Sequence, residues 1–371
     1  MTGPRVLLTC DFHLKYSAGL ARGLAERGAA VTLLSRTHDL EFGGRSGESR
    51  RYVEGMLDGR ARYTALGGRA GDVRSLPVAW RLRREIAEFA PEAVHFQDQV
   101  VNDPRLVLAS GVPPRAFALT VHDPVFHPGQ SRAGIGRDAG RRWMIRKARL
   151  IFVHADALRD ELLERERITG TVVVVPHGIG AASVAPLPKR PSLLFFGRLS
   201  VYKGLDTLLD AMPLVWERVP EATLTVAGDG PLEAHPVLAD ERVSLRHEHV
   251  PEADVPDLFA RSTCLVLPYR QASQSGVGGQ AKRYGRAIVA TAVGGLPELV
   301  GDEMGRVVPP EDPAALAAAL IEVLTVPGLS DSLGAAAAER GQAEAGWPRI
   351  AELTLDAYAR HLPPRSHATA S

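Results

Sequence analysis

Two cations in one short loop are the residues of this sequence best suited to hold an anion. Arg198 and Lys203 lie between an apolar run at residues 193–196 and a helical pattern that begins at Gly204. Such a loop belongs to the sheet edge at which parallel-sheet proteins collect ligands, and the backbone N–H groups of a helix start also favour anions. The pair suits a diphosphate, although two ordinary surface cations would leave the same pattern.

A glycine-rich segment could supply further phosphate contacts. It follows the apolar run at 264–267, leads into a helical pattern ending near Gly285, and reads Ala272-Ser273-Gln274-Ser275-Gly276-Val277-Gly278-Gly279-Gln280. Glycines let backbone N–H groups approach a ligand closely, and a helix start attracts phosphate oxygens. A glycine-rich loop that binds nothing is the alternative.

A histidine at the end of a predicted strand could act on a hydroxyl. His122 follows the apolar run at 117–121, where it could hydrogen-bond a neutral hydroxyl or a developing charge; a packed or capping histidine is the alternative. The loop at 9–17 could present Gly19 and backbone amides at a helix start, but it lacks the Gly-x-Gly-x-x-Gly of dinucleotide-binding folds. Other histidines near strand ends lack the spacing of metal ligands, so no metal site is expected: His95, His154 and His177.

The elements that must position these residues follow a regular rhythm. Short apolar runs alternate with longer helical patterns, as in parallel strands joined by crossover helices. Strands are expected at 6–8, 30–34, 93–96, 117–121, 150–153 and 172–175, and again at 193–196, 223–227, 243–246, 264–267, 287–291 and 306–308. The segment between the two sets, 177–191, is rich in Gly, Ala, Pro and Ser, as interdomain linkers are.

This rhythm predicts an α/β protein with two doubly wound parallel sheets. We expect a first domain at residues 1–180, a second at 181–345, a terminal helix at 346–363 and a tail at 364–371.

Composition narrows the classes of partner. The chain has 371 residues, of which 45% are hydrophobic and 23% charged, as is usual for globular proteins. Its formal net charge of +1 gives no overall field that would favour nucleic acid.

Cys10 and Cys264 stand in or beside apolar runs, as buried thiols do, and no signal peptide is recognised, so a cytoplasmic location is expected. A basic run at 137–149 is expected to be a solvated helix face, with peripheral membrane contact as the alternative.

An ordered series of motifs resembles the retaining glycosyltransferases of family 4. The resemblance covers nearly the whole chain and is strongest from Leu193 to Leu320. Its segments include Phe196-Gly197-Arg198-Leu199 with Lys203-Gly204-Leu205-Asp206, Val226-Ala227-Gly228-Asp229-Gly230-Pro231-Leu232, and Gly294-Gly295-Leu296-Pro297-Glu298. The resemblance implies the GT-B architecture, in which two Rossmann-like, doubly wound parallel-sheet domains face a cleft.

The same resemblance implies roles for the residues above. Arg198 and Lys203 would hold the donor diphosphate and neutralise the charge that grows on it as the glycosidic bond breaks, so no metal or other cofactor is required. His122 would contact a sugar hydroxyl or the reacting centre. The phosphates would also meet the amides around Ser275, Gly276 and Val277, and the nucleobase would meet the segment near Val250.

One departure concerns a pair of glutamates that the family usually carries across the glycine-rich loop, one on the nucleotide ribose and one facing the sugar. Gln280 and Ala272 occupy those positions here. Gln280 can still hydrogen-bond ribose hydroxyls, but without the strength of a charge-assisted bond. The Ala-Ser-Gln-Ser-Gly-Val sequence resembles that of a subgroup of the family, in which Gln274 or Ser275 would take over sugar contacts.

The expected function is transfer of a hexosyl unit from a nucleoside diphosphate sugar, UDP- or GDP-linked, to an acceptor hydroxyl with retention of anomeric configuration. Retention follows from the resemblance alone. Two alternatives stay open: a catalytically silent nucleotide-sugar-binding protein and a sugar-nucleotide epimerase. The acceptor, whether a sugar, a glycolipid or a small metabolite, would be selected by the loops at 36–73.

Overall fold

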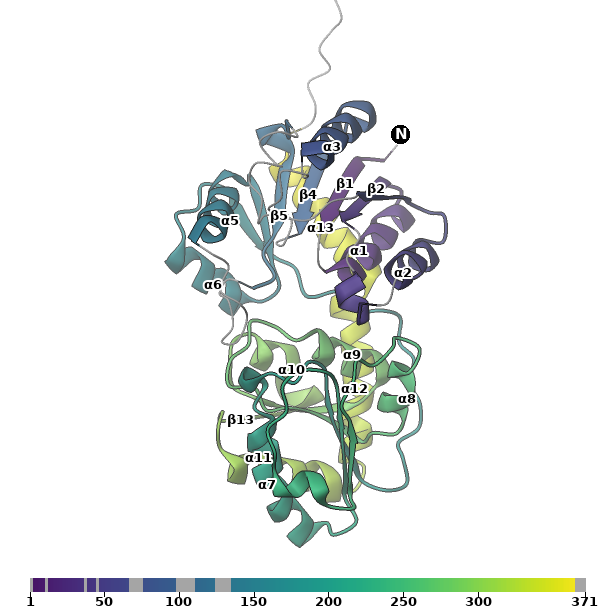
Figure 1. Cartoon of the computed structure of the whole chain (residues 1–371), viewed down its shortest axis with the longest axis vertical. Coiled ribbons are helices and arrows are strands. Elements are labelled where there is room, and N and C mark those ends of the chain that lie inside the picture. Colours follow the sequence, from purple (N-terminus) through teal and green to yellow (C-terminus); the bar gives the residue numbers. More distant parts are fainter. Residues whose placement is uncertain are drawn as a thin grey trace, which may run out of the picture. The chain divides into compact units, whose positions relative to one another are not determined.

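The computed structural model describes residues 3–10, 13–36, 39–44, 47–66, 76–97, 111–123 and 135–363. The expected tail at 364–371 and parts of the expected acceptor loops at 36–73 lie outside these residues. The described chain forms two compact units, each with its own parallel sheet (Figure 1). The second unit is Ile179–Gly346, and the first contains the described residues before it together with residues 347–363.

The first unit is built on a seven-stranded parallel sheet with the order β3-β2-β1-β4-β5-β6-β7. Its strands are β1 (Arg5–Cys10), β2 (Ala30–Arg36), β3 (Arg62–Leu66), β4 (Ala93–Gln97), β5 (Phe117–Thr120), β6 (Leu150–Val153) and β7 (Thr171–Val174). The chain runs from β1 out to β3 and then returns to β4 on the other side of β1. The carboxyl ends of β1 and β4 therefore flank the topological switch point, where open parallel sheets bind ligands.

Helices accompany these strands, and all of them except α13 lie between two strands of this sheet in the chain. They are α1 (Leu14–Glu26), α2 (Glu48–Leu57), α3 (Leu76–Phe89), α5 (Ile135–Lys147), α6 (Asp156–Arg165) and α13 (Trp347–His361), with short 3₁₀ turns η1 (Asp39–Phe42) and η4 (Pro114–Ala116). Helix α13 packs against α1 (Figure 1). Gly23 allows the two helices to approach closely, because a Cβ at this position would lie only 2.8 Å from the Trp347 carbonyl oxygen.

The expected position of Gly19 at a helix start is wrong. Helix α1 begins at Leu14, so Gly19 lies in its second turn, buried where a Cβ would overlap the Trp347 ring. The amides that start α1 belong to Leu14 and Lys15, and both donate to Glu41 Oε2, at 2.7 and 3.4 Å. The sequence placed the helix start too late because apolar periodicity begins only near Ala18. The helix begins a turn earlier, where the Glu41 carboxylate from another segment accepts hydrogen bonds from its first amides.

The second unit has a six-stranded parallel sheet with the order β10-β9-β8-β11-β12-β13. Its strands are β8 (Ser192–Phe196), β9 (Thr223–Ala227), β10 (Val243–Arg246), β11 (Cys264–Leu267), β12 (Ala287–Thr291) and β13 (Gly305–Val308). Its helices are α7 (Leu205–Arg218), α8 (Val255–Ala260), α9 (Gly276–Tyr284), α10 (Leu296–Met304), α11 (Pro313–Thr325) and α12 (Leu329–Ala345), with 3₁₀ turns η5 (Val201–Lys203) and η6 (Pro236–Ala239).

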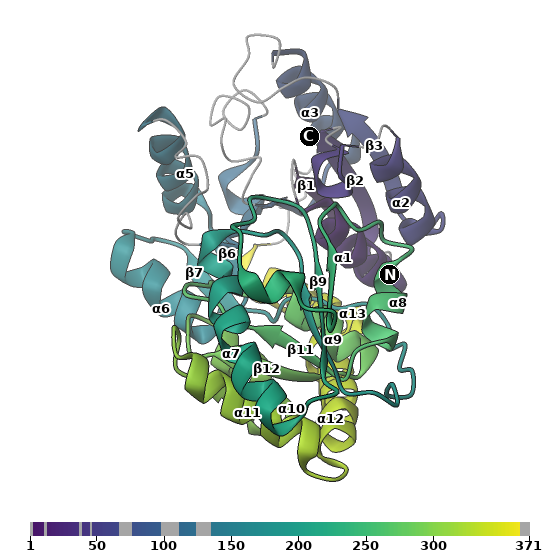
Figure 2. The ribbon, with the colours of Figure 1, turned by 60° about the horizontal axis from the view of Figure 1, so that its bottom comes forward.

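Both faces of this sheet are covered. Leu193 and Phe195 of β8 join one apolar cluster and Leu194 joins the other, because successive side chains of a strand point to opposite faces. Helices α7 and α11 pack against each other on the first face (Figure 2), and α8, α9 and α10 supply apolar residues to the second. Coverage on both faces explains why the inner strands β8, β11 and β12 are nearly continuous apolar runs in the sequence.

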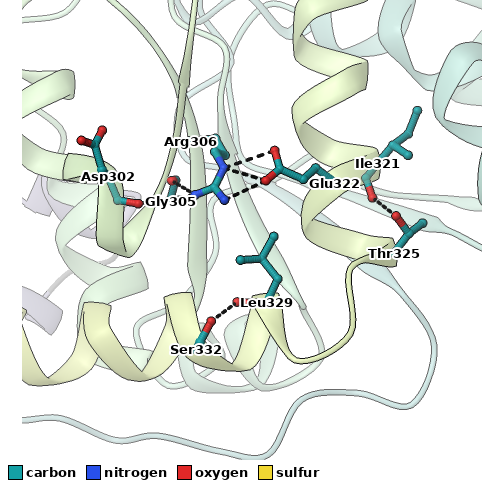
Figure 3. A network of polar contacts seen from close by, with 8 residues as sticks. All are labelled: Asp302, Gly305, Arg306, Ile321, Glu322, Thr325, Leu329 and Ser332. Carbon is teal, nitrogen blue, oxygen red and sulfur yellow. Dashed lines mark hydrogen bonds and ion pairs between the residues drawn. The ribbon is translucent and has the colours of Figure 1, made fainter.

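An ion pair ties the edge strand of this unit to its helical cover. Arg306 of β13 donates to Glu322 of α11, with Nη2 and Oε1 2.7 Å apart, and Arg306 Nη1 also donates to the Gly305 carbonyl oxygen at 2.8 Å (Figure 3). Hydrogen bonding from Arg306 lowers the pKa of Glu322. Since both side chains are partly exposed, the pair contributes about 1 kcal/mol at most.

Among the described residues, no single helix has the length and apolar content to cross a bilayer. Helices α11 and α12 meet those two criteria only when taken together, and the chain bends by 96° between them.

Candidate functional site

The candidate site of the second unit lies at the switch point between β8 and β11. Strands β9 and β10 lie on the far side of β8, and β12 and β13 lie on the far side of β11. The loop after β8 carries Arg198 and Lys203, and the loop after β11 leads into α9. The structure therefore brings the two cations and the glycine-rich segment to one edge of one sheet, where a ligand is expected.

Lys203 is a buried cation. Only 8% of the residue is exposed, and its Nζ lies 5.2 Å from the centroid of the Tyr269 ring. Within the described part of the chain, no carboxylate forms an ion pair with it. A Cβ on Gly197 would lie 2.8 Å from this Nζ and 3.3 Å from Val277 Cγ2, so the ammonium group lies beside the first turn of α9. A buried ammonium is costly unless an anion neutralises it.

Backbone contacts hold the loop that carries Lys203. Gly204 has a φ of 63°, and a Cβ at this position would overlap the Pro268 carbonyl oxygen. The Arg270 amide donates to the Tyr202 carbonyl oxygen at 2.7 Å, so the loops after β8 and β11 are joined directly. Lys203 is therefore presented by a preorganised loop, which is what stabilisation of a developing charge requires.

The N-terminus of α9 adds backbone donors. Ser275 caps the helix, because its Oγ accepts a hydrogen bond from the Gly278 amide at 3.1 Å. The amides of Gly276 and Val277 precede the first hydrogen bond within the helix and have no partner inside it. Gly276 is exposed, so this helix end is open to an anion.

The other expected binding residues differ in how available they are. Arg198 is exposed and, among the described residues, pairs with no carboxylate. Gln274 and Gln280 each bury a side-chain Oε1 that has no hydrogen-bond partner in the described chain, a defect that a ligand hydroxyl would remove. Val250 is 5% exposed and packs in the apolar cluster under α8, so its side chain is not available to a ligand.

In the first unit, His122 lies in a buried cluster of rings at the switch point of that sheet. Its ring stacks on that of His13, with centroids 3.8 Å apart and planes 14° apart. Tyr16 meets it edge-on with centroids 4.9 Å apart, and the rings of His154 and His177 lie 4.8 and 6.2 Å away. Among the described residues, no group of three or more His, Cys, Asp or Glu side chains is arranged to hold a metal ion.

Both ring nitrogens of His122 have protein partners. Nε2 lies 2.8 Å from the Gln97 carboxamide, and Nδ1 lies 3.0 Å from His154 Nε2. The sequence predicted that His122 would address a hydroxyl but did not predict these partners. One feature of the sequence could have pointed to Gln97. Gln97 directly follows the expected strand at 93–96, just as His122 directly follows the expected strand at 117–121.

Burial lowers the pKa of the histidines in this region. It brings the pKa of His154 to about 4 and that of His95 to about 3. Burial, with neighbouring histidines adding to it, holds the pKa of His122 well below its ordinary value. Burial raises the pKa of Tyr16. These groups are therefore neutral at pH 7.

We expect the first unit to lose stability as the pH falls from about 6.5 to about 4. The unfolded chain binds protons at its histidines in this range, whereas the folded chain keeps His95 and His154 neutral. The unfolded state therefore binds more protons, and the free energy of unfolding falls by about 1.4 kcal/mol per pH unit for each such histidine. Urea unfolding at a series of pH values measures the slope. His154→Phe should reduce it, and an unchanged slope would remove His154 from this explanation.

Comparison with protein families identifies two matching regions. Residues 15–182 match the model described as Glycosyltransferase Family 4, and residues 190–326 match the model described as Glycosyl transferases group 1. A glycogen synthase of Mycobacterium tuberculosis is 28% identical over 292 residues, which span 72% of this chain and 68% of the relative. A D-inositol 3-phosphate glycosyltransferase of Kineococcus radiotolerans is 30% identical over 275 residues, 64% of this chain and 63% of the relative.

Solved structures share the fold over almost the whole chain. Sucrose-phosphate synthase from Thermosynechococcus elongatus superposes with a TM-score of 0.72 at 19% identity, covering 96% of this chain and 98% of that one. Anabaena HepE in complex with UDP-glucose superposes with a TM-score of 0.70 at 14% identity, covering 96% and 100%. The two parallel-sheet units therefore have the GT-B arrangement of elements that the sequence predicted.

Proposed function

Because the chain belongs to the GT-B glycosyltransferases, we propose that it transfers a hexosyl unit from a nucleoside diphosphate sugar to an acceptor hydroxyl with retention of anomeric configuration. The observation that carries the proposal is the buried ammonium of Lys203, which has no carboxylate partner in the described chain and lies beside the open first turn of α9. A diphosphate supplies the missing negative charge and takes hydrogen bonds from the same helix end.

The proposed site residues of the second unit each have a role in this reaction. Lys203 and Arg198 bind the diphosphate and stabilise the charge that develops on it as the bond to the sugar breaks. The amides of Ser275, Gly276 and Val277 bind the same phosphates. Gln280 and Gln274, each with an unpartnered buried oxygen, accept hydrogen bonds from ribose and sugar hydroxyls. The backbone near Val250 meets the nucleobase.

The reaction needs no protein base at the acceptor. The bond between the anomeric carbon and the phosphate oxygen breaks, the acceptor oxygen bonds to that carbon on the same face, and the acceptor proton passes to the departing phosphate. We propose that fixed cations alone carry the charge stabilisation in this step, without a metal. The HepE complex with UDP-glucose supports a UDP-sugar as donor, and the acceptor is a sugar, a glycolipid or a small metabolite.

A thermal-shift screen of nucleotide-sugars tests the proposal. One donor family should stabilise the wild-type chain, by about 2.7 kcal/mol at one hundred times its Kd. Arg198→Ala should lose most of this shift, while Arg218→Ala, at an exposed arginine near the end of α7, should keep it. An unchanged shift in Arg198→Ala would remove that residue from the site. Stabilisation without release of nucleoside diphosphate in the presence of acceptors would indicate a silent binding protein instead.

A further inference from the structure

A chain of hydrogen bonds runs through the buried ring cluster of the first unit. His154 Nδ1 lies 3.0 Å from the Val175 carbonyl oxygen, and His154 Nε2 lies 3.0 Å from His122 Nδ1. The other nitrogen of His122, Nε2, lies 2.8 Å from the near atom of the Gln97 carboxamide. The far atom of that carboxamide is buried and has no hydrogen-bond partner in the described chain. Such an unpartnered buried group is unfavourable and calls for an explanation.

The carbonyl at one end of the chain fixes the direction of every bond. A carbonyl oxygen only accepts, so His154 Nδ1 carries a proton. In a neutral His154, Nε2 is then an acceptor, and His122 Nδ1 must donate to it. In a neutral His122, Nε2 is in turn an acceptor, so the near atom of Gln97 must be the amide NH₂ group. If the oxygen of Gln97 were the near atom, His122 Nε2 would have to donate to it. The hydrogen bond between His122 and His154 would then need a second proton on one of the two rings, and that ring would be an imidazolium.

The surroundings favour the neutral chain. His122 is fully buried, and its neighbours are the rings of His13, Tyr16, His154 and His177. No carboxylate in the described chain is hydrogen-bonded to His122 or His154. Removing a cation from water without such a partner is strongly unfavourable. Oxygen and nitrogen of a carboxamide have nearly the same shape, so hydrogen-bond partners decide its orientation.

We infer that Gln97 donates its NH₂ group to His122 and keeps its carbonyl oxygen as a buried acceptor for a hydroxyl of a bound sugar. Gln97 is the last residue of β4, at the switch point where this sheet is built to bind a ligand. A hydroxyl is the ligand group that fits, because an anion would be repelled by a carbonyl oxygen. His122 and His154 are then positioning residues that act through Gln97. That the ligand is a sugar rests on the proposed function; the orientation of the carboxamide does not.

The orientation is tested on the unliganded full chain by ¹⁵N NMR of labelled histidine. His122 and His154 should both be neutral with the proton on Nδ1. In His154→Phe, which keeps a ring of similar size, His122 loses its acceptor and should move its proton to Nε2. A wild-type His122 protonated on Nε2, or on both nitrogens, would overturn the inference even if no nucleotide-sugar binds.

The ligand is tested by calorimetric titration of wild type and Gln97→Met with UDP, UDP-glucose, and free glucose in the presence of UDP. UDP should bind both proteins equally, since it lacks the hexosyl group whose hydroxyl would donate to Gln97. A roughly 5- to 10-fold loss confined to UDP-glucose assigns the hydroxyl to the donor sugar, and one confined to glucose assigns it to an acceptor sugar. Equal losses for all three probes, or none, would overturn the role of Gln97. Failure of wild type to bind UDP at all would instead overturn the proposed function.

Discussion

Lys203→Met should lower kcat by about 10² to 10³, because it removes a fixed cation from the point where charge develops on the leaving phosphate. Methionine keeps the unbranched apolar stem over the Tyr269 ring while it removes the ammonium group. Release of nucleoside diphosphate from the donor identified by the binding screen measures the effect.

The folded state should tolerate this change. Since no carboxylate of the described chain pairs with Lys203, its removal leaves no uncompensated acid, and the unliganded protein should unfold at the same temperature or a higher one. Lys189→Met, at an exposed lysine ahead of β8, is the matched control and should keep the wild-type rate. Wild-type turnover in Lys203→Met would contradict the assignment of Lys203 to the leaving group.

Gly204→Ala should strongly destabilise the second unit and abolish nucleotide binding. The substitution has two costs: a left-handed φ of 63°, and a Cβ that overlaps the Pro268 carbonyl oxygen. The first is worth about 1–2 kcal/mol, and relief of the second requires the loops after β8 and β11 to separate. Separation would move Lys203 away from the start of α9.

Gly328→Ala separates the two costs. Gly328 has a φ of 73°, and a Cβ there would meet nothing within 4 Å. This variant should therefore lose only the conformational term, about 1–2 kcal/mol, and should keep full affinity for the nucleotide. Calorimetric unfolding and UDP titration of both variants make the comparison. Similar losses in both would show that contact between the two loops does not hold the site.

The sequence predicted the second sheet well, and most directly its inner strands β8, β11 and β12, which are buried on both faces and are therefore nearly continuous apolar runs. Strands at 223–227, 243–246, 264–267 and 287–291 have the expected bounds. The edge strand β3 and helix α2 were not predicted. Only Leu66 of β3 is fully buried, and α2 buries little beyond Ser49, Val53 and Leu57, so neither has a clear apolar pattern.

The candidate site was predictable where it depends on one loop and unpredictable where it depends on partners. Arg198, Lys203 and the start of α9 follow strands of the expected sheet, so strand order brings them together. That Lys203 is buried beside Tyr269 depends on the packing of two loops, which periodicity does not encode. His122 was found from its strand end, but its bonds to Gln97 and His154 join three separate strand ends and leave no local pattern.

The most direct measurement of the central claim is the position of UDP in crystals of the wild-type protein. The account predicts that oxygens of the diphosphate lie within about 2.7–3.2 Å of both Lys203 Nζ and the Val277 amide nitrogen. A diphosphate bound at another edge of the sheet, with Lys203 still lacking an anionic partner, would contradict it.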